Sequence, residues 1–134
     1  MYKTVSESVE TVLALKPLVA NANHCDVVIA PVFTSLKTVC DRLEGSNIKV
    51  AAQDCSTEIK EGAHTGEVAA FMIRDVGARY VIIGHSERRQ YYAETDAHVN
   101  QKVHAALQSG LIAIVCVGET LEQREAGLAQ EIVS

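Results

Sequence analysis

Residues 80–89 read YVIIGHSERR, four apolar residues followed by a glycine, a histidine and a polar, charged segment. A short apolar run that stops at a glycine predicts a buried strand. The segment after the histidine predicts a helical turn, which Ser86 could cap. We therefore expect a strand that passes directly into a helix, with His85 at the junction.

Three more apolar runs lie on either side of this one along the chain. They occupy residues 27–30, 48–52 and 111–117. All four runs are nearly continuous in apolar residues and do not alternate with polar ones, which is typical of parallel strands covered on both faces. We expect four strands of a parallel sheet.

The segments between these runs show helical periodicity. Apolar residues recur every three or four positions in four segments, formed by Val5, Val9, Val12, Leu15 and Val19, by Leu36, Val39, Cys40 and Leu43, by Val68, Phe71, Met72 and Val76, and by Val99, Val103, Ala106 and Leu107. Gly45, Gly77 and Gly110 are placed to end three of these helices in the left-handed conformation. Thr120 opens a capping-box sequence that predicts a fifth helix.

Helices and strands alternate along the chain, so residues 1–134 are expected to form a single α/β domain. Two architectures share this order. One is an open, doubly wound sheet, and the other is part of a (β/α)8 barrel, whose complete form takes about 250 residues. Periodicity does not choose between them.

The composition argues against several kinds of partner. The chain has 17 acidic and 12 basic side chains, a net charge of −5 and 4% aromatic residues, which is unlike a nucleic-acid surface. Its longest wholly apolar stretch, 111–117, is far shorter than the roughly 18 to 20 residues of a membrane span, and Met1 opens no signal peptide. We expect neither nucleic acid nor a membrane as a partner, whereas a small anionic metabolite needs only local positive potential.

Cysteine and histidine spacings predict neither disulfides nor a metal centre. Cys25, Cys40, Cys55 and Cys116 form no C-x-x-C pair and lie in or beside apolar runs, so we expect buried free thiols in a reducing cytoplasm. None of the five histidines has a zinc-ligand spacing. The glycine-rich motifs of nucleotide sites are also missing. We expect no metal and neither of the usual dinucleotide and nucleotide phosphate cradles.

Polar residues follow the apolar runs at their carboxyl ends. Gln53 and Asp54 follow the second run, His85 the third, and Gly118 and Glu119 the fourth. Both candidate architectures bind ligands at this edge of a parallel sheet. We therefore expect the functional face there.

His85 has the clearest chemical meaning of these residues. The N–H groups at a helix start carry partial positive charge, which disfavours an imidazolium and keeps a histidine neutral and able to donate a hydrogen bond. Such a histidine suits an electrophile that faces a carbonyl. The alternative is a histidine that only fills the strand end. Glu87, Arg88 and Arg89 are more typical of a surface ion-pair cluster than of a site.

A glycine-bracketed loop, EGAHTGE at residues 61–67, lies in a long connection between strand and helix. Long loops in compact domains often carry function, so this one is either an interaction loop or a surface excursion. Near the fourth strand, Cys116 stands between two valines and is expected in the core. Glu119 could orient a neighbouring group.

Five segments, in this order, resemble triosephosphate isomerase. They are IAP (29–31), VAAQD (50–54), GAHTGE (62–67), IGHSERR (83–89) and VGETLEQREAG (117–127). The resemblance runs nearly end to end and favours the barrel over the open sheet. It implies an isomerase of glycolysis and gluconeogenesis that interconverts dihydroxyacetone phosphate and glyceraldehyde 3-phosphate through an enediolate, in the cytoplasm and without a cofactor.

The resemblance also implies roles for individual residues. His85 matches the family's catalytic electrophile, which polarises the substrate carbonyl and moves a proton between the two substrate oxygens, and Glu87 matches a supporting glutamate. The family is a homodimer, and the residues matched to its subunit contact are Gln53, His64, Thr65, Gly66, Glu67 and Arg88, with Thr65 at the loop tip. Asp54 and His64 stand where the family often has asparagine and an aromatic residue, which bears on dimer packing and not on the assignment.

By the same resemblance the chain is a partial TIM barrel, with strands two to five of eight. The family's first strand carries a substrate-binding Asn-x-Lys and its sixth a glutamate base, and neither has a match in residues 1–134. Proton abstraction needs a base within about 3 Å of the carbon, so we expect the isolated chain to be inactive. Its two open sheet edges also predict marginal stability and association.

Two other functions remain as alternatives. A self-standing flavodoxin-like domain could bind a small phosphorylated ligand or act as a receiver, although a receiver needs an acidic pair where this chain has Pro31-Val32-Phe33. A structural fragment could instead act only by docking to a complementary half-barrel. Mixing the chain with the missing segments would separate these two functions.

Overall fold

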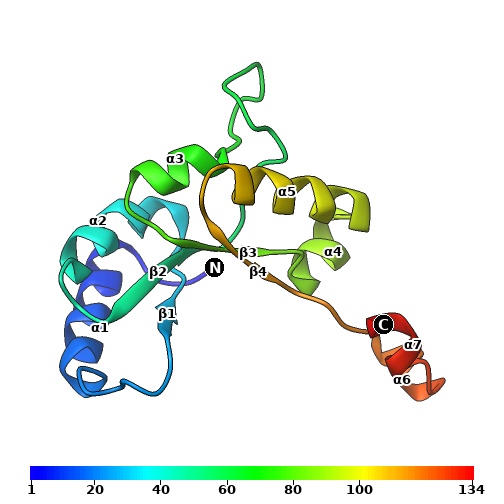
Figure 1. Ribbon diagram of the computed structural model, residues 1–134, viewed down its shortest axis with the longest axis horizontal. Coiled ribbons are helices and arrows are strands. Elements are labelled where there is room, and N and C mark those ends of the chain that lie inside the picture. Colours follow the sequence, from blue (N-terminus) through cyan, green and yellow to red (C-terminus); the bar gives the residue numbers. More distant parts are fainter.

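Four strands lie side by side in the order in which they occur along the chain. They are β1 (Val27–Ile29), β2 (Ile48–Ala52), β3 (Tyr80–Ile83) and β4 (Ile112–Val115). All neighbours pair in parallel, and the register aligns Ala51 with Tyr80 and Tyr80 with Ile112. The structure, a computed structural model, describes residues 1–134 (Figure 1). The predicted α/β class and parallel sheet are confirmed, and β1 and β4 are shorter than their apolar runs.

The order of the strands decides between the two architectures. A doubly wound sheet reverses its strand order at a switch point, so spatial order and chain order differ. Here every strand lies beside the next one along the chain, as in a segment of a (β/α)8 barrel. Figure 1 shows the helices that join the strands arranged around one side of the curved sheet. The expected partial barrel is confirmed, and the open doubly wound sheet is not found.

Helices connect and follow the strands. They are α1 (Val5–Leu18), α2 (Phe33–Leu43), α3 (Ala70–Asp75), α4 (Ser86–Tyr92), α5 (Asp96–Gln108), α6 (Leu121–Glu125) and α7 (Ala129–Val133). Gly45, Gly77 and Gly110 have φ angles of +74°, +104° and +72° and end α2, α3 and α5 as predicted. The capping box at Thr120 is also confirmed at the start of α6. No helix is both long and apolar enough to cross a membrane.

The core lies between the sheet and the helices. Val39 of α2, Ile73 of α3, and Val81 and Ile83 of β3 are completely buried there. Because side chains alternate along a strand, Ile82 points to the opposite face of the sheet, where it lines a cleft at the carboxyl ends of the strands. The helices therefore cover the outer face of the sheet, and the polar residues lie at the carboxyl ends of the strands.

Two predicted apolar helix faces need correction. The helix α3 begins after Val68 and exposes Met72, while Ile73 is buried in its place. In α5, Leu107 is exposed and Lys102 is buried. Lys102 can be buried because its ammonium is paired with the carboxylates of Asp54 and Glu94.

The inner face of β4 is not covered, although the sequence predicted cover on both faces. Ile112 is 53% exposed, and Ile114 on the same face is exposed as well. Ala113, which points the other way, packs against the core. An edge strand with one bare apolar face agrees with the open edge expected of a partial barrel.

The four cysteines are all unpaired, but the prediction that they are buried holds only in part. Cys55 is buried and Cys40 and Cys116 are half-buried, whereas Cys25 is exposed just before β1. Burial raises the pKa of Cys40, and it raises the pKa of Cys55 to about 12. The exposed Cys25 lies in the turn between α1 and β1, which has little around it to pack against.

Candidate functional site

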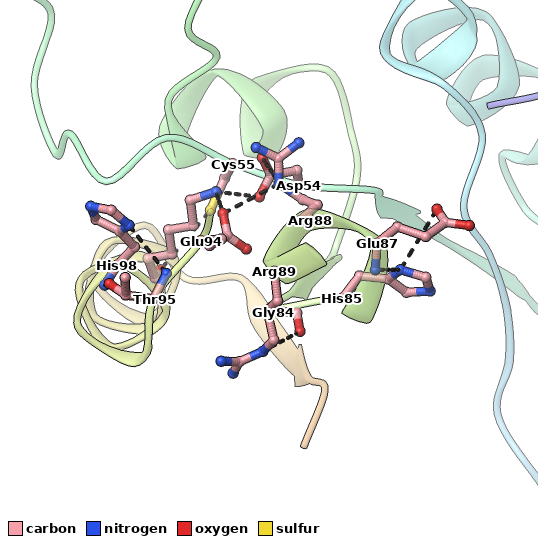
Figure 2. Close-up of polar contacts among 11 residues, drawn as sticks. Asp54, Cys55, Gly84, His85, Glu87, Arg88, Arg89, Glu94, Thr95 and His98 are labelled. Carbon is pink, nitrogen blue, oxygen red and sulfur yellow. Dashed lines mark hydrogen bonds and ion pairs between the residues drawn. The ribbon is translucent and has the colours of Figure 1, made fainter. Parts of the chain in front are cut away.

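His85 stands at the junction between β3 and α4. It is the N-cap residue of α4, and its Nδ1 accepts a hydrogen bond from the backbone N–H of Glu87 at 3.2 Å (Figure 2). The imidazole thereby satisfies one of the N–H groups that a helix start leaves unpaired. The prediction that Ser86 caps this turn is wrong, because Ser86 is already the first residue of the helix.

This contact favours one proton position on the ring. A ring nitrogen that accepts a hydrogen bond carries no proton, so the proton of the neutral imidazole lies on Nε2. A second proton on Nδ1 would point at the Glu87 N–H and at the partial positive charge of the helix start. In its neutral form the ring therefore has one free donor, Nε2–H.

The ring opens onto a cleft of about 530 Å³ at the carboxyl ends of the strands. Gln53, Asp54 and Arg88 also line this cleft, so the structure brings together polar residues that follow different strands. Gln53 donates from Nε2 to the carbonyl of Ala30 at 2.8 Å and so joins the ends of β2 and β1. The cleft has the position at which parallel α/β folds bind ligands.

Glu87 lies beside the edge of the imidazole that carries Nδ1. The carboxylate Oε2 is 3.8 Å from Nδ1 of His85, and the Glu87 side chain is 70% exposed. Nδ1 is the nitrogen that Glu87's own N–H already occupies, and Nε2 is at the opposite edge of the ring. Glu87 therefore adds negative charge near the ring without reaching a group bound at Nε2.

A buried charged cluster lies next to this helix turn (Figure 2). The ammonium of Lys102 contacts the carboxylate of Glu94 and lies 2.7 Å from Oδ1 of Asp54. The guanidinium Nε of Arg88 lies 2.9 Å from Asp54 and 3.2 Å from Glu94. The cluster joins the end of β2, both ends of α4 and the middle of α5.

The two carboxyl groups of the cluster respond differently to burial. Burial raises the pKa of Asp54 above its ordinary value, and the hydrogen bond and charge of Lys102 only partly offset this effect. Burial also works to raise the pKa of Glu94, but Lys102 and Arg88 outweigh it and hold that pKa below its ordinary value. One oxygen of Glu94, Oε2, is buried without a hydrogen-bond partner.

Sequence reasoning missed Glu94 and Lys102. A signal was present, because Lys102 falls three residues after Val99 and four before Ala106 and so lies on the apolar face of α5. A lysine at such a position is paired when buried. The segment also differs from the surface cluster expected of Glu87, Arg88 and Arg89, since Arg88 and Arg89 each pair with carboxylates outside it.

The long connection between β2 and α3 leaves its tip in solvent. Thr65, Gly66 and Glu67 are exposed, and Figure 1 shows the loop projecting from the body of the chain. His64 is also exposed, and its Nε2 lies 3.6 Å from Oε2 of Glu58. Of the residues matched to a subunit contact, Gln53 and Arg88 lie instead at the cleft beside His85.

A second cleft of about 380 Å³ separates the ends of β3 and β4. Cys116 and Glu119 line it together with His85, so Cys116 is not the core residue that was predicted. The carboxylate of Glu119 lies 2.6 Å from Nε of Arg124, and its pKa is lowered by a backbone hydrogen bond and by Arg124. No group of three or more His, Cys, Asp or Glu side chains is arranged to hold a metal ion.

Comparisons with known proteins agree with this geometry. The family model described as triosephosphate isomerase matches residues 1–134. A triosephosphate isomerase of Pelobacter propionicus is 55% identical over 126 residues, which are 94% of this chain and 50% of that protein. One of Clostridium botulinum (strain ATCC 19397 / Type A) is 52% identical over 133 residues, 99% of this chain and 53% of that protein.

A solved structure is also similar. The triosephosphate isomerase of Bartonella henselae superposes with a TM-score of 0.91 at 39% identity, over 98% of this chain and 54% of that one. The chain thus spans about half the length of the curated relatives that it matches.

Proposed function

This chain belongs to the triosephosphate isomerase family, and on that premise we propose that it supplies the electrophilic histidine of an enzyme that interconverts dihydroxyacetone phosphate and glyceraldehyde 3-phosphate. The observation that carries the proposal is the hydrogen bond from the Glu87 N–H to Nδ1 of His85. It leaves Nε2 as the free donor of a ring that lines the cleft. A neutral histidine at a helix start is the arrangement already established for this family.

In this role His85 acts on the substrate carbonyl. Its Nε2–H donates a hydrogen bond to the carbonyl oxygen, which stabilises the negative charge that forms when a base removes a proton from the neighbouring carbon. The product of that step is an enediolate. The imidazole then moves a proton between the two oxygens, and return of a proton to the other carbon completes the isomerisation.

The base is proposed to come from chain outside residues 1–134. Glu87, the carboxylate nearest to His85, lies beside Nδ1 and not on the Nε2 side where the substrate carbonyl would bind. We likewise assign the substrate-binding lysine and the phosphate-binding turns to the part of the family barrel that this chain does not span. Residues 1–134 alone are then inactive.

The whole protein is proposed to be a homodimer in the cytoplasm. The exposed loop tip at Thr65, Gly66 and Glu67 supports a contact with a second subunit, with His64 beside it. The unpaired thiols support a reducing compartment. Neither nucleic acid nor a membrane is a partner in this proposal, and the substrate is a small triose phosphate.

A joined enzyme tests the proposed function. Residues 1–134 are linked to the remaining segments of the Pelobacter propionicus relative, and turnover of dihydroxyacetone phosphate is measured for this protein and for the 134-residue chain. We expect the joined enzyme to turn over at about 1 to 1,000 per second and the short chain to show no turnover. His85→Asn in the joined enzyme should lower the rate about 100-fold or more. Full activity of that variant, or of the short chain, would refute the proposal.

A further inference from the structure

Arg89 contacts both peptide groups that flank the Cα of His85. Its side chain donates from Nε to the carbonyl of Gly84 at 2.8 Å, as Figure 2 shows. Its backbone N–H donates to the carbonyl of His85 at 3.1 Å. The first carbonyl belongs to the peptide bond before His85 and the second to the peptide bond after it. One residue therefore restrains both backbone dihedrals of the histidine.

Of the two contacts, only the side-chain hydrogen bond to Gly84 depends on residue 89 being an arginine. Any residue four positions into a helix donates its backbone N–H in the same way. The bond from the guanidinium to the Gly84 carbonyl, by contrast, requires a donor that can fold back over the start of α4. A second nitrogen of the fork, Nη1, lies 2.6 Å from Oδ1 of Asp96 at the start of α5. The guanidinium plane is thus held at two points.

Gly84 leaves space for this guanidinium because it has no Cβ. Its φ is +74°, and a Cβ at this position would lie 3.1 Å from Nη2 of Arg89 and 2.9 Å from Cγ2 of Val99. The guanidinium therefore packs directly against the glycine backbone. Any side chain larger than that of glycine at position 84 would clash with Val99 and press on Arg89.

The restraint matters because the hydrogen bond between the Glu87 N–H and Nδ1 of His85 depends on the backbone conformation of His85. His85 has φ −54° and ψ 141°, and with this backbone Nδ1 lies 3.2 Å from the backbone nitrogen of Glu87. Rotation about either dihedral would carry the ring away from that N–H. The side chain would then lose the contact that keeps Nδ1 free of a proton.

We propose that Arg89 is a positioning residue that fixes the backbone of His85, so that the ring keeps its proton on Nε2 and aims it at the cleft. The proposal rests on the proposed function, in which Nε2 is the electrophile. It adds a residue that does not touch the substrate. It also gives the second arginine of the segment a role different from that of Arg88, which holds the buried carboxylates.

The test reads the tautomer directly, without substrate. The ring nitrogens of His85 are observed by ¹⁵N NMR in the 134-residue chain at a pH where the ring is neutral, together with hydrogen exchange of the Glu87 amide. Arg89→Lys keeps the positive charge but not the fork. We expect the single Nε2–H tautomer of the wild type to become a mixture, and exchange of the Glu87 amide to rise about fivefold.

Two controls separate positioning from folding and from charge. Asp96→Asn removes the ion pair but leaves the bond to Gly84, and Arg42→Lys alters an arginine in the last turn of α2, away from His85; both should keep the wild-type tautomer. A folded Arg89→Lys protein with an unchanged tautomer and unchanged exchange overturns the proposal. If that variant does not fold, the wild-type chain decides the question. A scalar coupling across the hydrogen bond from Arg89 Nε to the Gly84 carbonyl is expected, and its absence overturns the proposal.

Failure of the positioning role can be distinguished from failure of the proposed function. If Arg89 controls the tautomer and the joined enzyme shows no turnover, the isomerase proposal fails alone. If the joined enzyme is active and Arg89→Lys leaves the tautomer unchanged, the positioning role fails alone.

Discussion

Lys102 of α5 lies 2.7 Å from Asp54, which follows β2 and is 48 residues away in the chain. The Lys102 side chain is only 7% exposed and also contacts Glu94. An ammonium in this position is surrounded by carboxylates that would otherwise repel one another in a poorly solvated space. The contact ties the strand end at the cleft to the helix that packs behind it.

Lys102→Met should therefore destabilise the chain strongly. The substitution keeps the apolar stem but leaves two buried carboxylates with Arg88 as their only cation, and loss of one partner of a buried pair costs about 3–5 kcal/mol. Urea unfolding of the 134-residue chain measures the change. Lys37→Met is the matched control, because Lys37 pairs with Asp41 on the surface of α2, and it should change stability far less than Lys102→Met. Equal losses for the two variants would contradict the assigned role of Lys102.

The same cluster predicts opposite pH dependences for its two acids. The pKa of Asp54 is raised on folding, so the folded state binds the proton more tightly and the Asp54 contribution to stability falls as the pH rises above about 4. The pKa of Glu94 is lowered on folding, so its contribution is present above about 4.3 and is lost as the pH falls through the folded value.

Two neutral variants separate these contributions. The free energy of unfolding of the wild type relative to Asp54→Asn should decrease as the pH rises above about 4, whereas relative to Glu94→Gln it should increase as the pH rises toward about 4.3 and then level off. Urea unfolding at several pH values gives both curves. Curves with the same sign would show that the assignment of the two shifts is wrong.

The sequence was sufficient for the regular parts of the fold. Continuous apolar runs predicted all four strands, and the glycine after α2, α3 and α5 marked where each helix ends, because both signals are local properties of the chain. Whether these strands form part of a barrel or an open doubly wound sheet could not be decided from periodicity. The in-order sheet decided it, since strand order is a property of tertiary packing.

Only His85 could be predicted as a site residue from its neighbours in the sequence. His85 stood out because a strand, a glycine and a charged turn meet there. Its capping role was not predicted, since serine is the better known cap and a histidine acceptor depends on ring orientation. Periodicity placed Lys102 on the apolar face of α5 but could not identify its partners, because Asp54 lies 48 residues away in the chain.

Thiol reactivity should separate the cysteines by exposure. Cys25 is exposed, whereas Cys55 is buried and its pKa is about 12. At pH 8 a thiol with that pKa is about one part in 10⁴ thiolate, which is the reactive form. A maleimide should therefore label Cys25 at least about 100 times faster than Cys55, as followed by mass spectrometry of peptides. In urea the two rates should become similar, and similar rates in the folded chain would contradict the buried position of Cys55.

Gly84→Ala should cost more than the same change at Gly45. Both glycines have a φ of +74°, so the strain of a left-handed alanine, about 1 kcal/mol, is common to both. Only at Gly84 does the new Cβ meet neighbours, Val99 at 2.9 Å and Arg89 at 3.1 Å, whereas nothing lies within 4 Å at Gly45. Overpacking adds about 1–3 kcal/mol at Gly84. Thermal unfolding measures the difference, and adding Val99→Ala should recover part of it.

The capping role of His85 can be separated from its chemistry. His85→Ala removes the acceptor for the Glu87 N–H and should cost about 1 kcal/mol, while Ser86→Ala should change stability by less than about 0.5 kcal/mol because Ser86 does not cap the helix. Thr120→Ala, at the capping box of α6, gives the expected size of a lost cap.

His85→Asn restores an acceptor and should recover most of the stability in urea unfolding. In the joined enzyme the same asparagine lacks a neutral imidazole donor and should leave turnover about 100-fold or more below the wild type. A stable His85→Asn protein with normal turnover would mean that His85 is a cap and nothing more.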